Sequence, residues 1–423
     1  MYLFFIRHFN DIDHTTPVVW EMVRNNYPVS VYCLNTSYDI HDDYRIAFLK
    51  SIGVDVDYLY NDACQDLGWW HQILCSLYLF NFAIERWTNK IGYWPLSPIV
   101  KKIGEYARIA GDRLFETTKN KFYDTHWASD FIGRKNAKAL CFDWVKPRHS
   151  VVDVLLKAAD RMDIPVLAMP HGVFVYTNKN ITIESRPLET YDKLNQYDGV
   201  VVQNELFREF MMRSGLKGEK ISVLGSARYC KEWIQQNKKI LPRTLDSDSN
   251  SSNRLRIVFM TTKLRYRINI EKLLSTLNLL TNFGGIDVKI KPHTRTAKES
   301  YIYENIPLVN AAETSSVELC EWADVIMVIG SSIILEPLIE SKPVLYLKYL
   351  HENTTIYEEY GACWIIRSED ELKDALNDLK RNRKKVAYSA ESVNHFISDI
   401  IYNNHTERDI LKDYIDFIVS FKK

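Results

Sequence analysis

Short apolar runs rich in β-branched residues alternate with stretches of helical periodicity along most of the chain. In the first half such runs are typical of buried strands and cover residues 2–6, 29–33, 139–143, 165–169, 199–203 and 221–224. Between the later runs, apolar residues recur at helical spacing over 151–162 and 205–214, and Gly215 is a suitable C-terminal stop. Strands separated by helices predict a parallel sheet.

The alternation stops at a polar run, 246–253, and then begins again. This run of Asp, Ser and Asn has no periodicity, so it predicts a linker or an exposed loop. Ser368 and Glu371 form a capping-box pattern that opens a helix running to about Arg381. The other elements expected after the polar run are a helix over 270–281 and strands over 255–260, 287–290, 324–328, 343–347 and 363–366.

Two separate series of strands predict two domains. A chain of 423 residues is also too long for one ordinary core. We therefore expect an α/β protein with two Rossmann-like, doubly wound domains that face each other across a cleft. The expected boundaries are 1–240 for the first domain, 241–253 for the linker, 254–404 for the second domain and 405–423 for a C-terminal helix.

Residues 65–130 depart from this pattern and predict a helical insertion in the first domain. The segment is rich in Tyr and Phe, contains Lys101 and Lys102, and holds five tryptophans, at positions 69, 70, 87, 94 and 127. Additional core and helix packing explains such a composition. An amphipathic surface for a membrane-held lipid acceptor is the alternative, because aromatic and basic side chains suit a membrane interface.

Composition narrows the class of protein. Lys and Arg number 54 and Asp and Glu number 54, so the net charge is zero, which argues against a nucleic-acid binder. The seven cysteines are scattered and include no CxxC pair, which fits reduced cytosolic thiols and gives no zinc signature. We see neither a signal peptide nor an apolar run of the roughly 18 residues that span a bilayer.

The strongest candidate chemistry lies in the second half, where polar residues follow predicted strands. Lys291, His293 and Arg295 come at the end of one strand, and donors gathered within five residues are best satisfied by an anion. Gly330, Ser331 and Ser332 follow another strand and open a predicted helix, whose free N–H groups suit a phosphate. A turn histidine and a plain serine N-cap remain the structural alternatives. Together the two segments predict a nucleotide-phosphate site.

Two further groups extend this donor site. Glu336 lies about one turn into the predicted helix, where it would bind a sugar hydroxyl or remain a solvated carboxylate. Thr262, Lys263 and Arg265 follow the first strand of the second domain, which places hydroxyls and cations at the same edge.

The first half supplies candidate catalytic residues. His171, in a Pro-His-Gly segment, ends a strand and is a candidate donor or general base. Asp11 and His14 follow the first strand as candidate bases, with a merely polar loop as the alternative. Arg228, in Gly-Ser-Ala-Arg, would reach a phosphate or a carboxylate unless it is solvated.

These segments, taken in order, resemble a known group of enzymes. Pro-His-Gly, Gly-Ser-x-Arg, Lys-Pro-His and Gly-Ser-Ser with a following Glu resemble the GT-B-fold transferases of bacterial surface polysaccharides. The nearest families are the capsule-polysaccharide and Kdo transferases and the CDP-glycerol glycerophosphotransferases of teichoic-acid synthesis. The resemblance covers roughly 140–350. It implies that His293, Ser331 and Ser332 hold the nucleotide phosphate, that His171 lies near the reacting centre, and that 405–423 packs back on the first domain.

The chain also departs from these families. Thr294 stands where Pro-His-Pro would continue, and Val-Ile-Gly-Ser-Ser replaces the Thr-Asp-Tyr-Ser-Ser of the glycerophosphotransferases, which favours a sugar donor over a polyol phosphate. Asp11–Asp13 and Asp246–Asp248 are the Asp-x-Asp pairs considered, and neither is placed to hold a metal beside the donor. We therefore expect no metal and no cofactor.

The sequence thus predicts a cytoplasmic glycosyltransferase, with peripheral contact at the inner face of the membrane through 65–130. It would transfer a sugar from a nucleotide-activated donor, a cytidine nucleotide by the resemblance, to a growing surface glycan or a lipid-linked acceptor. The leaving phosphate would be stabilised by cations and a helix dipole. Polyol-phosphate transfer, a nonhydrolysing nucleotide-sugar epimerase and a catalytically silent binding protein are the alternatives.

Overall fold

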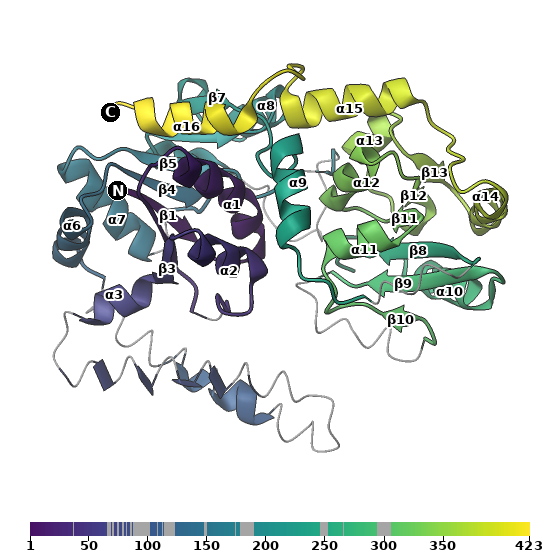
Figure 1. Ribbon diagram of the computed structural model, residues 1–423, viewed down its shortest axis with the longest axis horizontal. Helices are drawn as coiled ribbons and strands as arrows, with labels where there is room; N and C mark the ends of the chain where they lie inside the picture. The colour runs from purple at the N-terminus through teal and green to yellow at the C-terminus, as the bar shows by residue number, and fades with distance from the viewer. Residues whose placement is uncertain are drawn as a thin grey trace. The chain divides into compact units, whose positions relative to one another are not determined.

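The computed structural model describes residues 1–65, 123–147, 150–177, 190–245, 253–293 and 306–423, apart from 37, 174 and 265, together with scattered residues between 69 and 113. The chain divides into two compact units, which we describe separately (Figure 1). Unit 1 comprises 1–171, 190–228 and 409–423. Unit 2 comprises 172–189 and 229–408. No helix among the described residues is both long and apolar enough to cross a membrane.

Unit 1 contains a sheet of seven parallel strands in the order β3-β2-β1-β4-β5-β6-β7. In β1, β2 and β4 every residue is buried, as expected for strands covered on both faces. The strands are β1 (Tyr2–Ile6), β2 (Val29–Cys33), β3 (Asp55–Tyr58), β4 (Ala139–Asp143), β5 (Val166–Met169), β6 (Gly199–Val202) and β7 (Ile221–Val223).

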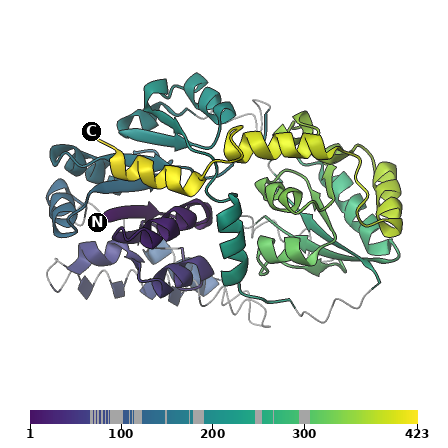
Figure 2. The same cartoon turned by 45° about the horizontal axis from the view of Figure 1, so that its top comes forward.

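Helices cover the sheet of unit 1. α6 packs with α7, and α1 packs with α2 and α16 (Figure 1). Figure 2 shows α16 lying along unit 1, where Tyr414 donates to the Gly225 carbonyl at 3.1 Å. A Cβ on Gly199 would come within 2.6 Å of the Phe421 ring. The bounds are α1 (Phe9–Arg24), α2 (Tyr44–Ser51), α3 (Leu59–Gln65), α6 (Thr125–Arg134), α7 (Ser150–Arg161), α8 (Glu205–Arg213), α16 (Ile410–Ser420), η1 (Asp192–Gln196) and η2 (Gly218–Lys220).

Unit 2 contains a second parallel sheet, of six strands in the order β10-β9-β8-β11-β12-β13. The strands are β8 (Leu255–Met260), β9 (Ile286–Lys291), β10 (Val309–Asn310), β11 (Val325–Val328), β12 (Val344–Leu347) and β13 (Trp364–Ile366). Apolar residues of α10 and α14 form one core with this sheet, and α12 packs with both α11 and α15. The helices are α9 (Lys231–Ile240), α10 (Ile270–Asn282), α11 (Ser316–Trp322), α12 (Leu335–Ile339), α13 (Ile356–Glu359), α14 (Glu369–Arg381), α15 (Ala390–Tyr402), η5 (Ser332–Ile334) and η6 (Lys348–Leu350).

Each sheet has a topological switch point, where the strand order reverses. In unit 1 it lies between β1 and β4, and in unit 2 between β8 and β11. Ligands of open parallel sheets bind outside the carboxyl ends of the strands at such points. The fold therefore marks one candidate position in each unit.

A short segment that we call the strap, residues 172, 173 and 175–177, belongs to unit 2 although His171 before it belongs to unit 1. Tyr176 of the strap forms an antiparallel bridge with Thr355. Thr177 N–H donates to the Thr354 carbonyl at 3.0 Å, and Ile356 N–H donates to the Val175 carbonyl at 2.9 Å. The strap is thus paired with residues 354–356 through a short antiparallel β-bridge.

The expected α/β class with two doubly wound, Rossmann-like domains is confirmed. Each strand expected from the sequence is present, with ends shifted by no more than two residues. Two edge strands, β3 and β10, were not expected: β3 alternates with aspartates, and β10 has two residues, both exposed. At 228/229 the chain passes from unit 1 to unit 2, so α9 falls in unit 2, whereas we expected the first domain to reach 240. Most of the expected insertion and the core of the linker lie outside the described residues.

Candidate functional site

Polar side chains converge at the switch point of unit 1. Arg7 and His8 directly follow β1, Asp143 is the last residue of β4, and His171 comes two residues after β5. Because β1, β4 and β5 are neighbours and parallel, their carboxyl ends lie side by side. The side chains therefore come together although more than 160 positions separate the first from the last.

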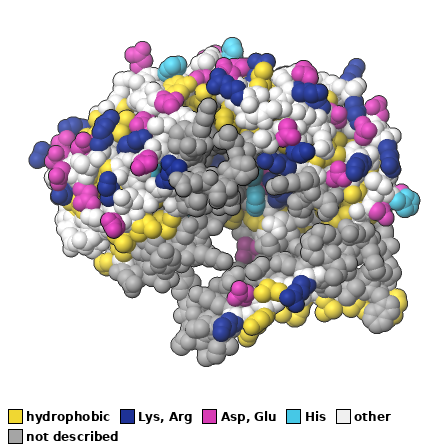
Figure 3. Space-filling view, turned by 180° about the vertical axis from the view of Figure 1, so that it is seen from behind, with side chains coloured by type: hydrophobic (Ala, Val, Ile, Leu, Met, Phe, Trp, Pro, Cys, Tyr) yellow, Lys and Arg dark blue, Asp and Glu magenta, His cyan; other side chains and the backbone are white. Residues whose placement is uncertain are grey.

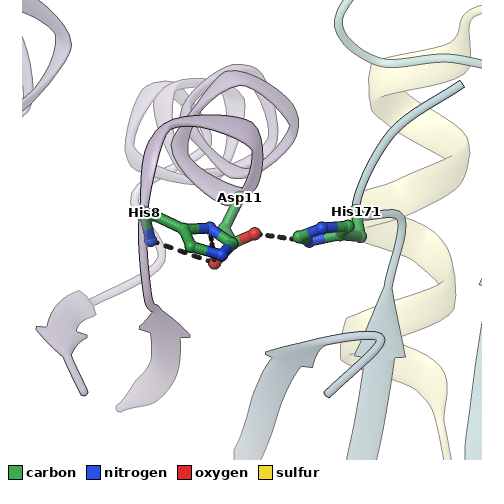
Figure 4. Close-up of side chains that lie close together, drawn as sticks. All are labelled: His8, Asp11 and His171. Atoms are coloured by element: carbon green, nitrogen blue, oxygen red, sulfur yellow. Dashed lines mark hydrogen bonds and ion pairs between the residues drawn. The ribbon is translucent and has the colours of Figure 1, made fainter. Parts of the chain in front are cut away.

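His171 lies between two buried carboxylates. Its Nδ1 is 2.5 Å from Oδ1 of Asp11 (Figure 4). The same atom is 3.1 Å from Oδ2 of Asp143. Burial disfavours the charged imidazolium, but hydrogen bonds to Asp11 and then Asp143 outweigh it and raise the pKa of His171 to about 9. The histidine is therefore protonated at neutral pH.

Asp11 is held ionised by its position in α1. It occupies the third residue of the helix, where its Oδ2 accepts from the backbone N–H of Arg7 at 2.8 Å and of His8 at 3.2 Å. A carboxylate in the first turn is also favoured by the helix dipole. Burial alone would raise the pKa of Asp11, but hydrogen bonds from His171 and His8 hold it well below its usual range.

Arginine side chains form ion pairs with the other two carboxylates of the site, Asp143 and Asp13. Arg7 binds Asp143 through Nε at 3.1 Å and also through Nη2, a forked pair that fixes the carboxylate beside His171. Arg228 lies 2.9 Å from Asp13 Oδ2, and Asp13 also contacts Arg45. The site is therefore an ionic network in which each carboxylate has a cationic partner.

His14 lies one helical turn beyond Asp11, on the same face of α1, and is fully enclosed. Burial, with smaller contributions from Arg228 and His171, lowers the pKa of His14 well below 6.5. His14 is therefore neutral at physiological pH. Two histidines at one site are held in opposite protonation states by their surroundings.

The described residues contain one group of histidine and acid ligand atoms close enough together for a metal ion, that of His8, Asp11 and His171, all within 4.8 Å. A metal ion would need a free lone pair on His171 Nδ1, whereas the protonated imidazole forms ion pairs there with two carboxylates. The Arg7 guanidinium, 3.9 Å from Asp11, would repel a second cation. We therefore interpret the group as holding a proton.

The structure brings together all four residues proposed from the sequence as catalytic, namely Asp11, His14, His171 and Arg228. The polar loop that was the alternative for Asp11 and His14 is absent, because both residues lie at the start of α1. Sequence reasoning missed Arg7, His8 and Asp143. An aspartate that closes an otherwise apolar strand was the signal available for Asp143.

The donor-site candidates lie at the carboxyl ends of three adjacent strands of unit 2. Thr262 and Lys263 follow β8, His293 follows β9, and Gly330 with Ser331 and Ser332 follows β11. Glu336 lies in the first turn of α12. Arg265 and Arg295 lie outside the described residues.

Two of these features differ from the expected phosphate cradle. Lys291 is buried, and its ammonium donates to the carbonyls of Ala312 at 2.5 Å and Thr314 at 2.7 Å. Burial lowers the pKa of Lys291 to about 8. These hydrogen bonds give Lys291 a structural role, so we do not include it among the proposed donor-binding residues. The helix expected after Ser332 is a single 3-10 turn followed by the five-residue α12.

No family model matches the chain, and no curated protein matches it. Solved structures are similar over its whole length. The UDP-GlcNAc 2-epimerase from Neisseria meningitidis bound to UDP-GlcNAc has a TM-score of 0.54 and 13% identity, with 100% of each chain covered. A putative UDP-N-acetylglucosamine 2-epimerase from Listeria monocytogenes gives 0.53 and 13%, covering 96% of this chain and 97% of that one. The wall teichoic acid polymerase TagF gives 0.50 and 13%, covering 99% and 90%. Together with the two doubly wound sheets, these likenesses show that the chain has the GT-B fold.

Proposed function

We propose that the protein is a GT-B glycosyltransferase that moves a sugar from a nucleotide-activated donor to a bacterial surface glycan or its lipid-linked precursor. The observation that carries the proposal is His171, held between Asp11 and Asp143 at the switch point of unit 1. An imidazole oriented by a carboxylate at Nδ1 leaves Nε2 as the atom that exchanges a proton with a substrate.

The proposed reaction uses His171 as general base. In its deprotonated form, which is the minor form at neutral pH, the imidazole takes the proton of the acceptor hydroxyl at Nε2 while the acceptor oxygen bonds the anomeric carbon of the sugar. The bond from that carbon to the phosphate oxygen breaks, and the nucleotide leaves with the electron pair. Asp11 keeps Nδ1–H oriented and stabilises the imidazolium that forms. The hydroxyl and cationic groups of unit 2, among them Thr262, Lys263 and His293, would stabilise the leaving phosphate.

The donor is proposed to carry uridine or cytidine. Three of the similar structures contain UDP or UDP-GlcNAc and one contains CDPG, which supports a pyrimidine nucleotide. A thermal-shift series with CMP, CDP, UDP, GDP and ADP tests this, because a ligand that binds the native state raises the melting temperature. No shift with any of the five would contradict the proposal.

We propose that the acceptor is held at a membrane surface. Large apolar side chains of the described residues in 69–113 are exposed, and Figure 3 shows hydrophobic side chains there, in the lower part of the view. Trp69, Phe80, Trp87 and Tyr106 are each exposed by more than 60%. Aromatic rings of this kind suit the headgroup region of a bilayer. Co-sedimentation with anionic vesicles tests the contact, and wild-type protein that stays in the supernatant would argue against it.

A nucleotide-sugar 2-epimerase is the second candidate. Its support is the full mutual coverage between this chain and the epimerase from Neisseria meningitidis. An epimerase converts UDP-GlcNAc without an acceptor, whereas a transferase needs one. Product analysis by NMR with UDP-GlcNAc alone separates the two. A parallel assay with CDP-glycerol as the donor tests polyol-phosphate transfer. Acceptor-free conversion of UDP-GlcNAc to a second nucleotide sugar would overturn the transferase proposal.

A further inference from the structure

The strap lies across the switch point of unit 2. Its pairing with 354–356 is reinforced by a hydrogen bond of 2.7 Å between the hydroxyls of Thr177 and Thr354. This pairing places the side chain of Tyr176 among residues that follow β8, β11 and β12. The strap thus delivers an aromatic side chain to the position where a doubly wound sheet binds its ligand.

The ring of Tyr176 is enclosed by other rings. It meets Tyr266 nearly edge-on at 5.5 Å and His351 at 90° and 6.3 Å. Burial raises the pKa of the Tyr176 phenol above its ordinary value and lowers that of His351 to about 4. Both groups are therefore neutral at physiological pH, and the phenol keeps its proton as a hydrogen-bond donor.

The phenol oxygen lies directly against the backbone of Gly330. A Cβ at this position would overlap that oxygen and come 2.6 Å from Cζ of the ring. Glycine is therefore required here for close approach. The other neighbour of the phenol is Thr262, whose Oγ1 is 3.4 Å away. The hydroxyls of Tyr176 and Thr262 thus meet between the ends of β8 and β11.

We propose that Tyr176 is a donor-binding residue, whose O–H acts with that of Thr262 to bind a phosphate oxygen of the nucleotide-activated donor. The bond between the two hydroxyls is long, so the phenol proton gains little from it. An ionised phosphate oxygen is a much stronger acceptor, and the surrounding rings keep water away. The inference rests on the proposed function, because it assigns a residue to the donor of that reaction.

The same segment connects donor binding to the proposed base. Tyr176 lies five positions after His171, and the strap begins at the next residue, Gly172. A donor phosphate bound by Tyr176 would add a contact that holds the strap, the segment that directly follows the base in the chain.

The test is the affinity of Tyr176→Phe for UDP and CDP, measured by calorimetry on the full chain. The variant removes the hydroxyl and keeps the ring between Tyr266 and His351. We expect about tenfold weaker binding of the nucleotide that wild type binds, as for the loss of one hydrogen bond to a charged group. Tyr349→Phe is the matched control, because its phenol also bonds a threonine, Thr276 at 2.6 Å, but one that lies on α10.

The outcomes of this test separate a donor-binding role of Tyr176 from a packing role. Equal affinity of wild type and Tyr176→Phe would make Tyr176 a packing residue and overturn the inference, while leaving the proposed function intact. Weaker binding by both tyrosine variants would indicate a general loss of packing and would also overturn it. If wild type binds no nucleotide, the proposed function fails and the inference fails with it. Hydrogen exchange of 175–177, slowed by nucleotide in wild type and less so in Tyr176→Phe, is the readout of positioning.

Discussion

The two units have the same kind of switch point and fill it in opposite ways. In unit 1 the ends of β1, β4 and β5 carry acids, an arginine and a protonated histidine, arranged as ion pairs. In unit 2 the ends of β8 and β11 carry hydroxyls and a glycine, covered by the neutral ring of Tyr176. One topology therefore carries an ionic network in unit 1 and, between the ends of β8 and β11, a pair of hydroxyls under a neutral aromatic ring. The residues at and just after the strand ends decide which of the two forms.

The difference also has an energetic side. A buried ionic network is sensitive to the loss of any one partner, because the remaining charge is left unpaired. A neutral aromatic cover depends on shape, so it is sensitive to added volume and much less to charge. The following predictions separate these two kinds of dependence, beginning with the largest expected effect.

Replacing His171 by asparagine should lower the transfer rate by roughly 10²–10⁴-fold, the range for loss of a general base. The neutral amide retains polarity near Asp11 and Asp143 but cannot take a proton. Single-turnover assays with donor and acceptor measure the effect. His126→Asn is the control, because His126 is an exposed histidine of unit 1. A His171→Asn enzyme with the wild-type rate would exclude His171 as the base.

Asp11→Asn should destabilise unit 1 by about 3 kcal/mol, because it leaves buried donors and the His171 imidazolium without their carboxylate. It should also lower the pKa of His171, since the hydrogen bond to Asp11 is the largest cause that raises it. Chemical denaturation gives the first quantity and NMR titration of the imidazole the second. The matched variant is Asp160→Asn, which removes an exposed ion pair with Lys423. Equal losses in the two variants would contradict the ionic picture of this site.

Gly330→Ala should destabilise unit 2 by about 1–3 kcal/mol, the usual cost of added volume in a packed site. The new methyl group would overlap the Tyr176 phenol. Adding Tyr176→Ala to this variant should recover part of the stability lost through the clash, which a double-mutant cycle measures. Strictly additive effects of the two substitutions would show that Tyr176 does not occupy this position in solution.

The pH dependence should distinguish the two histidines of unit 1. The pKa of His171 rises to about 9 in the folded protein, so its stabilising effect is complete below pH 6.5 and is lost as the pH rises through about 9. For His14 the pKa falls, so stability is lost as the pH drops below 6.5. Denaturation midpoints between pH 5 and 10 test both, with His171→Asn removing the alkaline loss alone.

The pH dependence of activity should also reflect the titration of His171, in the direction expected for a general base. A general base with a pKa of about 9 is mostly protonated at pH 7, so kcat/KM should rise with pH until about 9. A rate that falls through the same range would assign His171 to hydrogen-bond donation instead.

The sequence predicted the fold well because its core strands are continuous apolar runs. β1, β4 and β8 are recognisable from their own residues, and the return of the pattern after 253 indicates a second sheet. β3 was missed because Asp55 and Asp57 break its apolar run, and tertiary pairing with β2 supplies what local sequence does not.

The site was predictable in part for a different reason. Asp11, His14 and His171 follow strands, and the carboxyl-edge rule is enough to bring them together. The pairing of Arg7 with Asp143 depends on which strands are neighbours, and strand order is not written in any local pattern. Tyr176 was missed altogether, because nothing in the sequence shows that a segment after His171 pairs with residues near 355.

The helix α16 has a consequence for how the chain comes to be folded. It packs against α1 and its phenylalanines lie on Gly199, so unit 1 is assembled from both ends of this sequence. During synthesis the strands of unit 1 leave the ribosome first, but the helix that covers them follows only after unit 2. Unit 1 therefore has its whole sheet available first but lacks this covering helix until unit 2 has been made, so unit 1 can be completed only after unit 2.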